Sequence, residues 1–170
     1  SNLDVNNAEI VNPSFELGTL TGWTPAGDGR VISKLGATGP VGGKFMGVMS
    51  TGMGYTLEVG SMSQKFCLPP DANTVQFYWN YFSEEFQEFC GTEYQDPFTA
   101  RLKSPGGNVT MVDVTVDSLC PSSKCFGCGG DYVGVYKSDV NFDQGDAWYI
   151  RWQKSKTNIA ALTAQQKPVE

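Results

Sequence analysis

The stretch Thr110-Met111-Val112-Asp113-Val114-Thr115-Val116-Asp117 alternates apolar and polar residues. Successive side chains of a β-strand point to opposite faces, so this pattern predicts a strand with one buried and one solvent-facing side. A second stretch, Val75-Gln76-Phe77-Tyr78-Trp79-Asn80-Tyr81-Phe82, alternates only in part and places aromatic residues on both faces. That arrangement is typical of a central strand covered on both sides. The two stretches favour an all-β chain.

Other short segments around these two are rich in β-branched or aromatic residues and are bounded by Gly, Pro, Asn or Asp, which is the pattern of strands. Pro105 to Asn108 is expected to form a hairpin tip and Leu68 to Asn73 a surface crossover. We expect a jelly-roll β-sandwich of two antiparallel sheets, with a short helix within residues 158–166. The further predicted strands are Arg30 to Ser33, Phe45 to Ser50, Tyr55 to Val59, Met62 to Cys67, Phe98 to Leu102, Tyr132 to Tyr136 and Ala147 to Trp152.

The length of 170 residues predicts one domain, over residues 10–170, preceded by an N-terminal extension over residues 1–9 in which Ser1 and Asn2 resemble a cloning remnant. The formal net charge is -6, and proteins that bind nucleic acid concentrate Lys and Arg instead. We therefore expect no nucleic-acid partner. The sequence also lacks a run of about 20 apolar residues, so no membrane span is expected.

The chain has no histidine and five cysteines. Without histidine, the usual general base at neutral pH and the histidine-containing hydrolase triads are excluded. Cysteines in an acidic chain rich in Gly, Asn and Thr favour extracellular disulfides, so we expect a secreted or cell-surface protein. Two bridges and one odd thiol follow from the count. The candidates are Cys67, Cys90, Cys120, Cys125 and Cys128.

Three of these cysteines have the spacing C-x4-C-x2-C, from Cys120 to Cys128. The same spacing occurs in plant-type iron-sulfur sites, but those sites have a fourth cysteine downstream, and none follows Cys128. The fold could in principle supply Cys67 or Cys90 in its place. We therefore favour a disulfide-pinned loop in which two of these three cysteines pair. A bond between Cys67 and Cys90 would then join the long strand to the loop after it, and other pairings remain open.

The run from Phe82 to Phe98 concentrates acidic residues between two aromatic strands. Like charges on one loop repel unless water or a cation offsets them. Calcium is the cation that accepts carboxylate and carbonyl oxygens in irregular geometry. The alternative is a glycoside hydrolase, which needs two carboxylates that face each other across a sugar cleft. Because the acids lie on one loop, we favour a non-catalytic protein.

A second polar feature is Glu16, which lies between the expected core residues Phe15 and Trp23 and requires a partner for its charge. The segments Asn12 to Trp23 and Gly42 to Val48 resemble the opening of carbohydrate-binding jelly rolls. That resemblance implies a structural calcium bound by Glu16, to which Lys44 contributes its carbonyl.

The Ser83-Glu84-Glu85-Phe86 sequence and the residues as far as Phe98 resemble the signature of bacterial choice-of-anchor surface domains, which occur in exported proteins and adhesins. The resemblance covers roughly residues 10 to 155. It implies calcium ligands at Glu84, Glu85 and Asp96, and a calcium-stabilised module for adhesion or surface assembly. This chain has Gln95 where the family often has Asn, and it adds Cys90. The alternative function is that of a carbohydrate-binding module.

Partners of such a module are a glycan or another surface protein. Sugar rings stack on exposed aromatic side chains, so the candidates for ligand binding are Trp79, Tyr81 and Tyr94, with Tyr55, Trp148 and Trp152 as further aromatics. The resembled family continues beyond a strand like the one at Trp148 to Trp152. The resemblance therefore implies that the final strands are lacking here, and that another chain completes the open edge by donating a strand.

Overall fold

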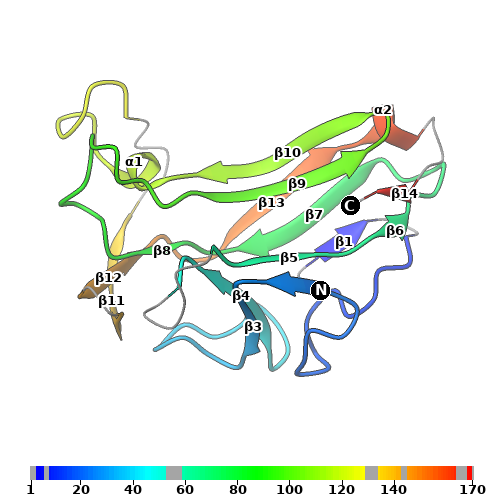
Figure 1. Ribbon diagram of the computed structural model, residues 1–170, viewed down its shortest axis with the longest axis horizontal. Helices are drawn as coiled ribbons and strands as arrows, with labels where there is room; N and C mark the ends of the chain where they lie inside the picture. Colours follow the sequence, from blue (N-terminus) through cyan, green and yellow to red (C-terminus); the bar gives the residue numbers. More distant parts are fainter. Residues whose placement is uncertain are drawn as a thin grey trace.

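The computed structural model describes residues 3–5, 8–52, 59–128, 134–142, 145–163 and 168–169. Strands dominate this part of the chain, and every pairing of its named strands is antiparallel (Figure 1). The all-β, antiparallel class predicted from the sequence is confirmed. Within the described ranges the pairings group the strands into several small sheets, the largest of which have three strands.

The strands are β1 (Leu3–Val5), β2 (Thr24–Ala26), β3 (Asp28–Ile32), β4 (Met46–Ser50), β5 (Ser61–Ser63), β6 (Phe66–Cys67), β7 (Thr74–Trp79), β8 (Phe82–Ser83), β9 (Phe98–Ser104), β10 (Gly107–Val114), β11 (Tyr136–Asn141), β12 (Asp146–Tyr149), β13 (Gln153–Asn158) and β14 (Pro168–Val169). Two short helices, α1 (Val116–Leu119) and α2 (Ala160–Thr163), accompany them. The sheets have the strand orders β1-β7-β13, β10-β9, β11-β12-β8, β14-β6, β2-β5 and β3-β4.

Strand β7 lies between β1 and β13 in one three-stranded sheet. Val75 of β7 is paired with Val5 on one side and with Thr157 on the other. Both valines are buried, which accounts for the strong apolar character of β7 and for its place inside a sheet. Strand β1, which lies within the N-terminal extension expected over residues 1–9, is therefore paired into the sheet of β7.

Strand β13 is not among the strands predicted from the sequence, because its segment Gln153-Lys154-Ser155-Lys156-Thr157-Asn158 contains no apolar residue. It pairs with β7 along its whole length. Lys154 and Lys156 are exposed and alternate with half-buried polar residues. The ladder bonds to β7, rather than apolar burial, hold this strand in place.

The hairpin of β9 and β10 turns between Ser104 and Gly107, as the Pro105 to Asn108 segment predicts. The register shifts at Met111, between Thr110 and Val112. At this bulge the hydroxyl of Ser155 donates a hydrogen bond to the Met111 carbonyl, over 3.1 Å. The bulge thus links β10 to the neighbouring strand β13.

The predicted long strand from Val75 to Phe82 is divided in two. Strand β7 ends at Trp79, and β8 pairs with β12 in a different sheet. At the break the Asn80 side-chain oxygen accepts the backbone N–H of Tyr81, over 2.8 Å. A side-chain acceptor here replaces a partner in the ladder, so the chain leaves one sheet and enters another.

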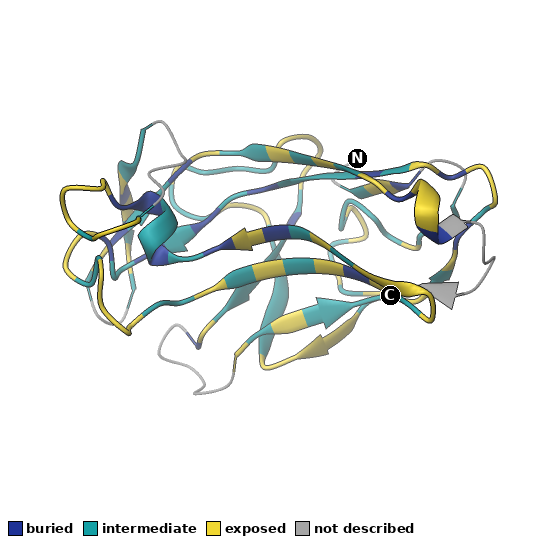
Figure 2. Cartoon of the chain, turned by 90° about the horizontal axis from the view of Figure 1, so that it is seen from above, coloured by how far each residue is buried: buried dark blue, intermediate teal, exposed yellow. Residues whose placement is uncertain are grey.

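Exposed positions alternate with half-buried or buried ones along β9, β11 and β13, and Figure 2 shows such changes of burial along several strands. Two core clusters result. The cluster near α1 determines where the candidate site lies, because it supports the loops on either side of that helix. It consists of Trp79, Tyr81, Phe86, Val112, Val114, Val116, Leu119, Cys120 and Ile150. The other cluster consists of Val5, Leu68, Ala72, Val75, Leu102, Ile159 and Leu162.

The remaining predicted elements agree with the structure in part. The helix expected within residues 158–166 is α2, shorter than expected, while the helix at α1 was not expected. The strand expected from Met62 to Cys67 is divided into β5 and β6. The strand from Tyr55 to Val59 lies largely outside the described residues, as does the start of the one at Tyr132. No helix within the described ranges is long and apolar enough to cross a membrane.

Candidate functional site

Two loops meet at the α1 end of the molecule. One runs from Glu84 to Asp96, between β8 and β9, and the other follows β10 and contains α1 and residues up to Cys128. Both lie at the left of Figure 1. We call residues 84–96 and 115–128 together the cysteine-tied loop end. It contains most of the residues that the sequence singles out for function.

A disulfide joins the two loops. Cys90 is bonded to Cys120, with 5.8 Å between their Cα atoms, and Cys125 is bonded to Cys128 within the second loop. Cys67 is the free cysteine and is exposed. Two bridges and one odd thiol are confirmed, but the pairing of Cys67 with Cys90 is wrong. Cys90 lies on the loop that packs against α1, whereas Cys67 belongs to β6, which pairs with β14.

Asp117 and Gln95 form a second link between the loops. The Gln95 amide oxygen accepts the N–H of Asp117 over 2.8 Å, and its Nε2 donates to Asp117 Oδ1 over 3.1 Å. The Gly91 N–H donates to the same oxygen over 2.7 Å. A Cβ added at Gly91 would lie only 2.7 Å from the Cβ of Cys125. The loops therefore contact each other closely, and the Asp117 carboxylate is held in one orientation.

Among the predicted metal ligands, Glu85 and Asp96 lie together. The Asp96 N–H donates to Glu85 Oε2 over 3.2 Å, and the Thr51 hydroxyl donates to Asp96 Oδ2 over 3.3 Å. The hydroxyl of Tyr81 donates to the Asp96 carbonyl. Burial raises the pKa of the Glu85 carboxyl, and the charges of Asp96 and Glu84 raise it further, while the bond from the Asp96 N–H lowers it. The ionised pair is thus electrostatically unfavourable in the folded chain.

The negative charges of Asp96 and Glu85 also act on the hydroxyl of Tyr81. Burial raises the pKa of its hydroxyl above the ordinary value, and Asp96 adds to the effect. The group therefore stays protonated, which suits its role as a donor to the Asp96 carbonyl.

Glu16 has a different environment. Both of its carboxylate oxygens accept the Lys44 N–H, over 3.1 and 3.0 Å, and Oε1 also accepts the Phe45 N–H over 3.2 Å. Gly43 has a φ of +78°, and a Cβ there would lie 2.3 Å from Glu16 Oε1. The charge partner that Glu16 requires is therefore backbone N–H groups. Lys44 contacts Glu16 through its backbone N–H, and binding of calcium by the Lys44 carbonyl stays a prediction.

The structure does not bring the predicted acids into one ligand sphere. Within the described residues, Glu84, Glu85 and Asp96 do not place three ligand atoms within 4.8 Å of one another. The group that does so is Asp117, Cys125 and Cys128, each half-buried. Asp117 was not selected from the sequence, because it lies outside the acidic run from Phe82 to Phe98. Its position at the end of an alternating strand, next to the C-x4-C-x2-C motif, is the signal that could have identified it.

The predicted ligand-binding aromatics divide into two kinds. Trp79 and Tyr81 are 7% and 6% exposed and belong to the core, which corrects the expectation of exposed stacking rings for these two. Tyr94 is 57% exposed and packs edge to face against Phe89. Phe126 was not selected from the sequence and is fully exposed. Its place between two cysteines of a C-x2-C turn is the signal that could have identified it, because so short a turn cannot fold its side chain onto the core.

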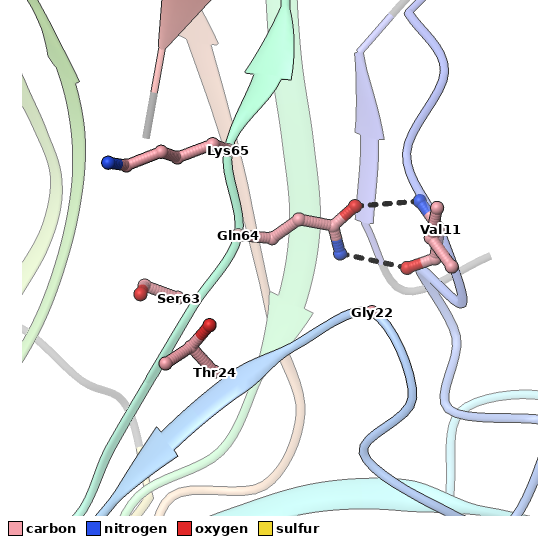
Figure 3. Close-up of a pocket in the computed structure, with 6 residues that line it drawn as sticks. All are labelled: Val11, Gly22, Thr24, Ser63, Gln64 and Lys65. Carbon is pink, nitrogen blue, oxygen red and sulfur yellow. Dashed lines mark hydrogen bonds between the residues drawn. The ribbon is translucent and has the colours of Figure 1, made fainter.

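Two open depressions on the surface lie away from Glu84, Glu85 and Asp96. The one in Figure 3 has a volume of about 470 Å3 and is lined by Val11, Gly22, Thr24, Ser63, Gln64 and Lys65. There the Gln64 side chain points to Val11 and makes hydrogen bonds to both its N–H and its carbonyl. A second depression, of about 390 Å3, lies between β10 and β13. The described lining of the first contains no carboxylate, and that of the second contains only Asp113. Neither supplies the carboxylate pair of a glycosidase.

Comparison of the chain with protein-family models, with curated proteins and with solved structures finds no match.

The two disulfides are expected to differ in their effect on stability. The Cys90–Cys120 bond spans 30 residues and the Cys125–Cys128 bond spans 3. Loop-closure entropy increases with the length of the closed loop, so Cys90→Ala/Cys120→Ala should lower the free energy of unfolding by about 3–4 kcal/mol and Cys125→Ala/Cys128→Ala by at most about 2 kcal/mol. Denaturant unfolding of both double variants checks this order. Equal losses would show that the loops are not held together by the longer bridge.

Glu85→Gln is expected to change how stability depends on pH. The folded pKa of Glu85 is raised, so the stability that its protonation contributes is present below the unfolded pKa and is lost as pH rises through the folded value. Without divalent cations, the variant should therefore gain in melting temperature relative to the wild type as the pH rises above the ordinary carboxyl pKa of 4.5. Gln87→Asn, a neutral change on the same loop, should follow the wild-type curve. A Glu85→Gln difference that does not vary with pH would contradict the assignment.

Proposed function

We propose that this chain is a non-catalytic, calcium-stabilised jelly-roll module of an exported bacterial protein, and that it contacts another surface protein through the cysteine-tied loop end. The observation that carries the proposal is the exposure of Tyr94 and Phe126, which are 57% and fully exposed on loops joined by Cys90–Cys120. Removal of exposed aromatic side chains from water by a partner is favourable, and aromatic anchors dominate the energy of protein interfaces.

Rigidity supports this choice of surface. The disulfide, the Gln95 amide and the Gly91 N–H all fix the loops before any partner binds. A surface that is ordered in advance loses less conformational entropy on association. Disulfides are also the mark of oxidising compartments, which agrees with a secreted or cell-surface location.

Calcium in this proposal acts on the acidic half of the loop end. Glu85 and Asp96 repel each other across a short distance, and the neighbouring Glu84 adds to that repulsion. A divalent cation bound by carboxylate and carbonyl oxygens would remove the repulsion and stabilise the fold. Glu16 takes no part in this site, because backbone N–H groups already compensate its charge.

Carbohydrate binding is the second candidate, and one observation favours it. Phe82, Tyr149 and Tyr136 lie opposite one another across β8, β12 and β11. The Phe82 and Tyr149 rings stack at 5.1 Å, and Tyr136 lies 5.9 Å from Tyr149. Arg151 stands over the Tyr136 ring at 3.8 Å. A row of aromatic rings is a surface on which sugar rings stack, although these three rings are half-buried whereas Tyr94 and Phe126 are exposed.

The calcium part is tested by thermal unfolding with calcium and with chelator. At a concentration 100-fold above the dissociation constant, calcium should add about 2.7 kcal/mol, which corresponds to about 5–10 °C in melting temperature. Asp96→Asn should lose this increment, while Glu93→Gln on the same loop should keep it. Glu16→Gln should lower the melting temperature equally in both buffers. Identical wild-type curves with calcium and with chelator would remove calcium from the proposal.

The binding part is tested on intact cells of the bacterium that produces the protein. The labelled chain should bind them, and Phe126→Ser should reduce binding at least about 10-fold, as expected for an aromatic anchor. Leu17→Ser is the matched control, because Leu17 is also exposed, at 62%, but lies outside the loop end. Protease treatment of the cells should abolish binding if the partner is a protein. Loss after periodate oxidation, which destroys sugars, would support the glycan instead.

A further inference from the structure

Three ligand atoms of the kinds that bind soft divalent metals converge beside α1. They belong to Asp117, Cys125 and Cys128, and all lie within 4.8 Å of one another. Each of the three residues is half-buried, so the group is neither fully hydrated nor enclosed in the core. Thiolate sulfur together with a carboxylate oxygen is a donor set that suits zinc. The two sulfurs are joined in a disulfide here, and that bond prevents them from binding a metal.

The Asp117 carboxylate is oriented for such a role by another part of the chain. Gln95 Nε2 and the Gly91 N–H both donate to Oδ1. No hydrogen bond or ion pair to Oδ2 occurs among the described residues. One oxygen is therefore held by the protein, while the described residues give the other no hydrogen-bond or ion-pair partner. Hydrogen bonds of this type fix the orientation of metal-ligating carboxylates and raise metal affinity.

The cysteines have the spacing and the position of a chelating pair. Cys125 and Cys128 are separated by two residues, which is the usual spacing of two cysteine ligands in structural zinc sites. Their Cα atoms lie 5.5 Å apart. Cys120 is not available to this group, because it is bonded to Cys90 and is completely buried. The set is thus two sulfurs and one carboxylate, which is too few thiolates for an iron-sulfur cluster.

We propose that Cys125, Cys128 and Asp117 form a zinc site that is controlled by redox state. A dithiol reductant transfers two electrons and two protons to the Cys125–Cys128 disulfide, and is itself oxidised to a disulfide. The two thiols then bind Zn2+ as thiolates, with release of two protons, and the Asp117 carboxylate is the third protein ligand. Water or an external group takes the fourth position. In the reverse step a small disulfide oxidant accepts two electrons from the two thiolates and, with two protons from water, becomes two thiols; the Cys125–Cys128 disulfide re-forms and Zn2+ is released.

This site does not depend on the proposed binding function, but it would act on the same surface. Phe126 lies between the two cysteines, so either the disulfide or the metal restrains the backbone that carries it. Replacement of the disulfide by the metal would change the conformation of this turn and therefore the direction of the Phe126 ring.

The test compares the oxidised and the reduced forms of the 170-residue chain. A phosphine reductant is used and then removed without oxygen, and peptide mapping identifies which disulfide is open. The chain is titrated with Zn2+ against a colorimetric chelator, and with Co2+ as a spectroscopic probe. The reduced chain should bind one equivalent of metal and show the sulfur-to-cobalt charge-transfer band. The oxidised chain should show neither.

Variants identify the ligands. Cys125→Ser/Cys128→Ser should abolish binding in the reduced state, whereas Cys67→Ser should leave it unchanged. Gln95→Ala, which removes a positioning residue, should weaken Zn2+ binding by about 10–100-fold, and Asp117→Asn by at least as much. Because the Cys125–Cys128 bridge closes only a short loop, its loss should leave the chain folded, which circular dichroism checks.

Three results would overturn the proposal. They are absence of zinc binding by the reduced chain, equal binding by the oxidised chain, and binding that survives in Cys125→Ser/Cys128→Ser. The last result would assign the metal to Cys90 and Cys120 instead, since reduction exposes those thiols in the same variant. Unchanged affinity in Asp117→Asn would remove the carboxylate from the site.

Discussion

The Cys90–Cys120 bond is the constraint on which the arrangement of the α1 end depends. Cys120 is completely buried beside Val116 and Leu119 of the core, so its sulfur is a fixed point. Through the bond, Cys90 and the acidic loop around it are held against that core. The contacts of Gly91 with Cys125 and of Gln95 with Asp117 connect the same two loops. These contacts act only over short distances, so they form only when the disulfide has brought the two loops together.

The carboxylates of the molecule differ mainly in what compensates their charge. Glu16 and Asp117 accept backbone N–H groups, from Lys44 and Phe45 in one case and from Gly91 in the other. Such bonds give the carboxylate oxygens partners without another ion. Glu85 also accepts one backbone N–H, but that group belongs to Asp96, whose own charge opposes ionisation of Glu85. This difference explains why we assign a cation to the acidic loop and not to Glu16.

The α1 end combines exposed aromatic rings with two cysteine sulfurs and a carboxylate. Their occurrence at the same place has a physical reason. Short loops between covalently fixed points cannot bury a large side chain. Phe126 therefore remains in water between its two cysteines, and Tyr94, which packs edge to face against Phe89, stays 57% exposed. The same shortness holds the two sulfurs close to Asp117. Exposure of aromatic rings and convergence of ligand atoms thus have one common cause.

The sequence by itself determined the all-β class, most strand positions, the β9–β10 turn and the number of disulfides. These features depend on local alternation, turn residues and a count of cysteines, which can be read without knowledge of long-range packing.

Only the tertiary structure decided the rest. Strand β13 has no apolar residue and is a strand because β7 offers it a ladder. The pairing of Cys90 with Cys120, the burial of Trp79 and Tyr81, and the meeting of Asp117 with Cys125 and Cys128 depend on which distant segments pack together. No local pattern contains that information, because it comes from packing over the whole chain.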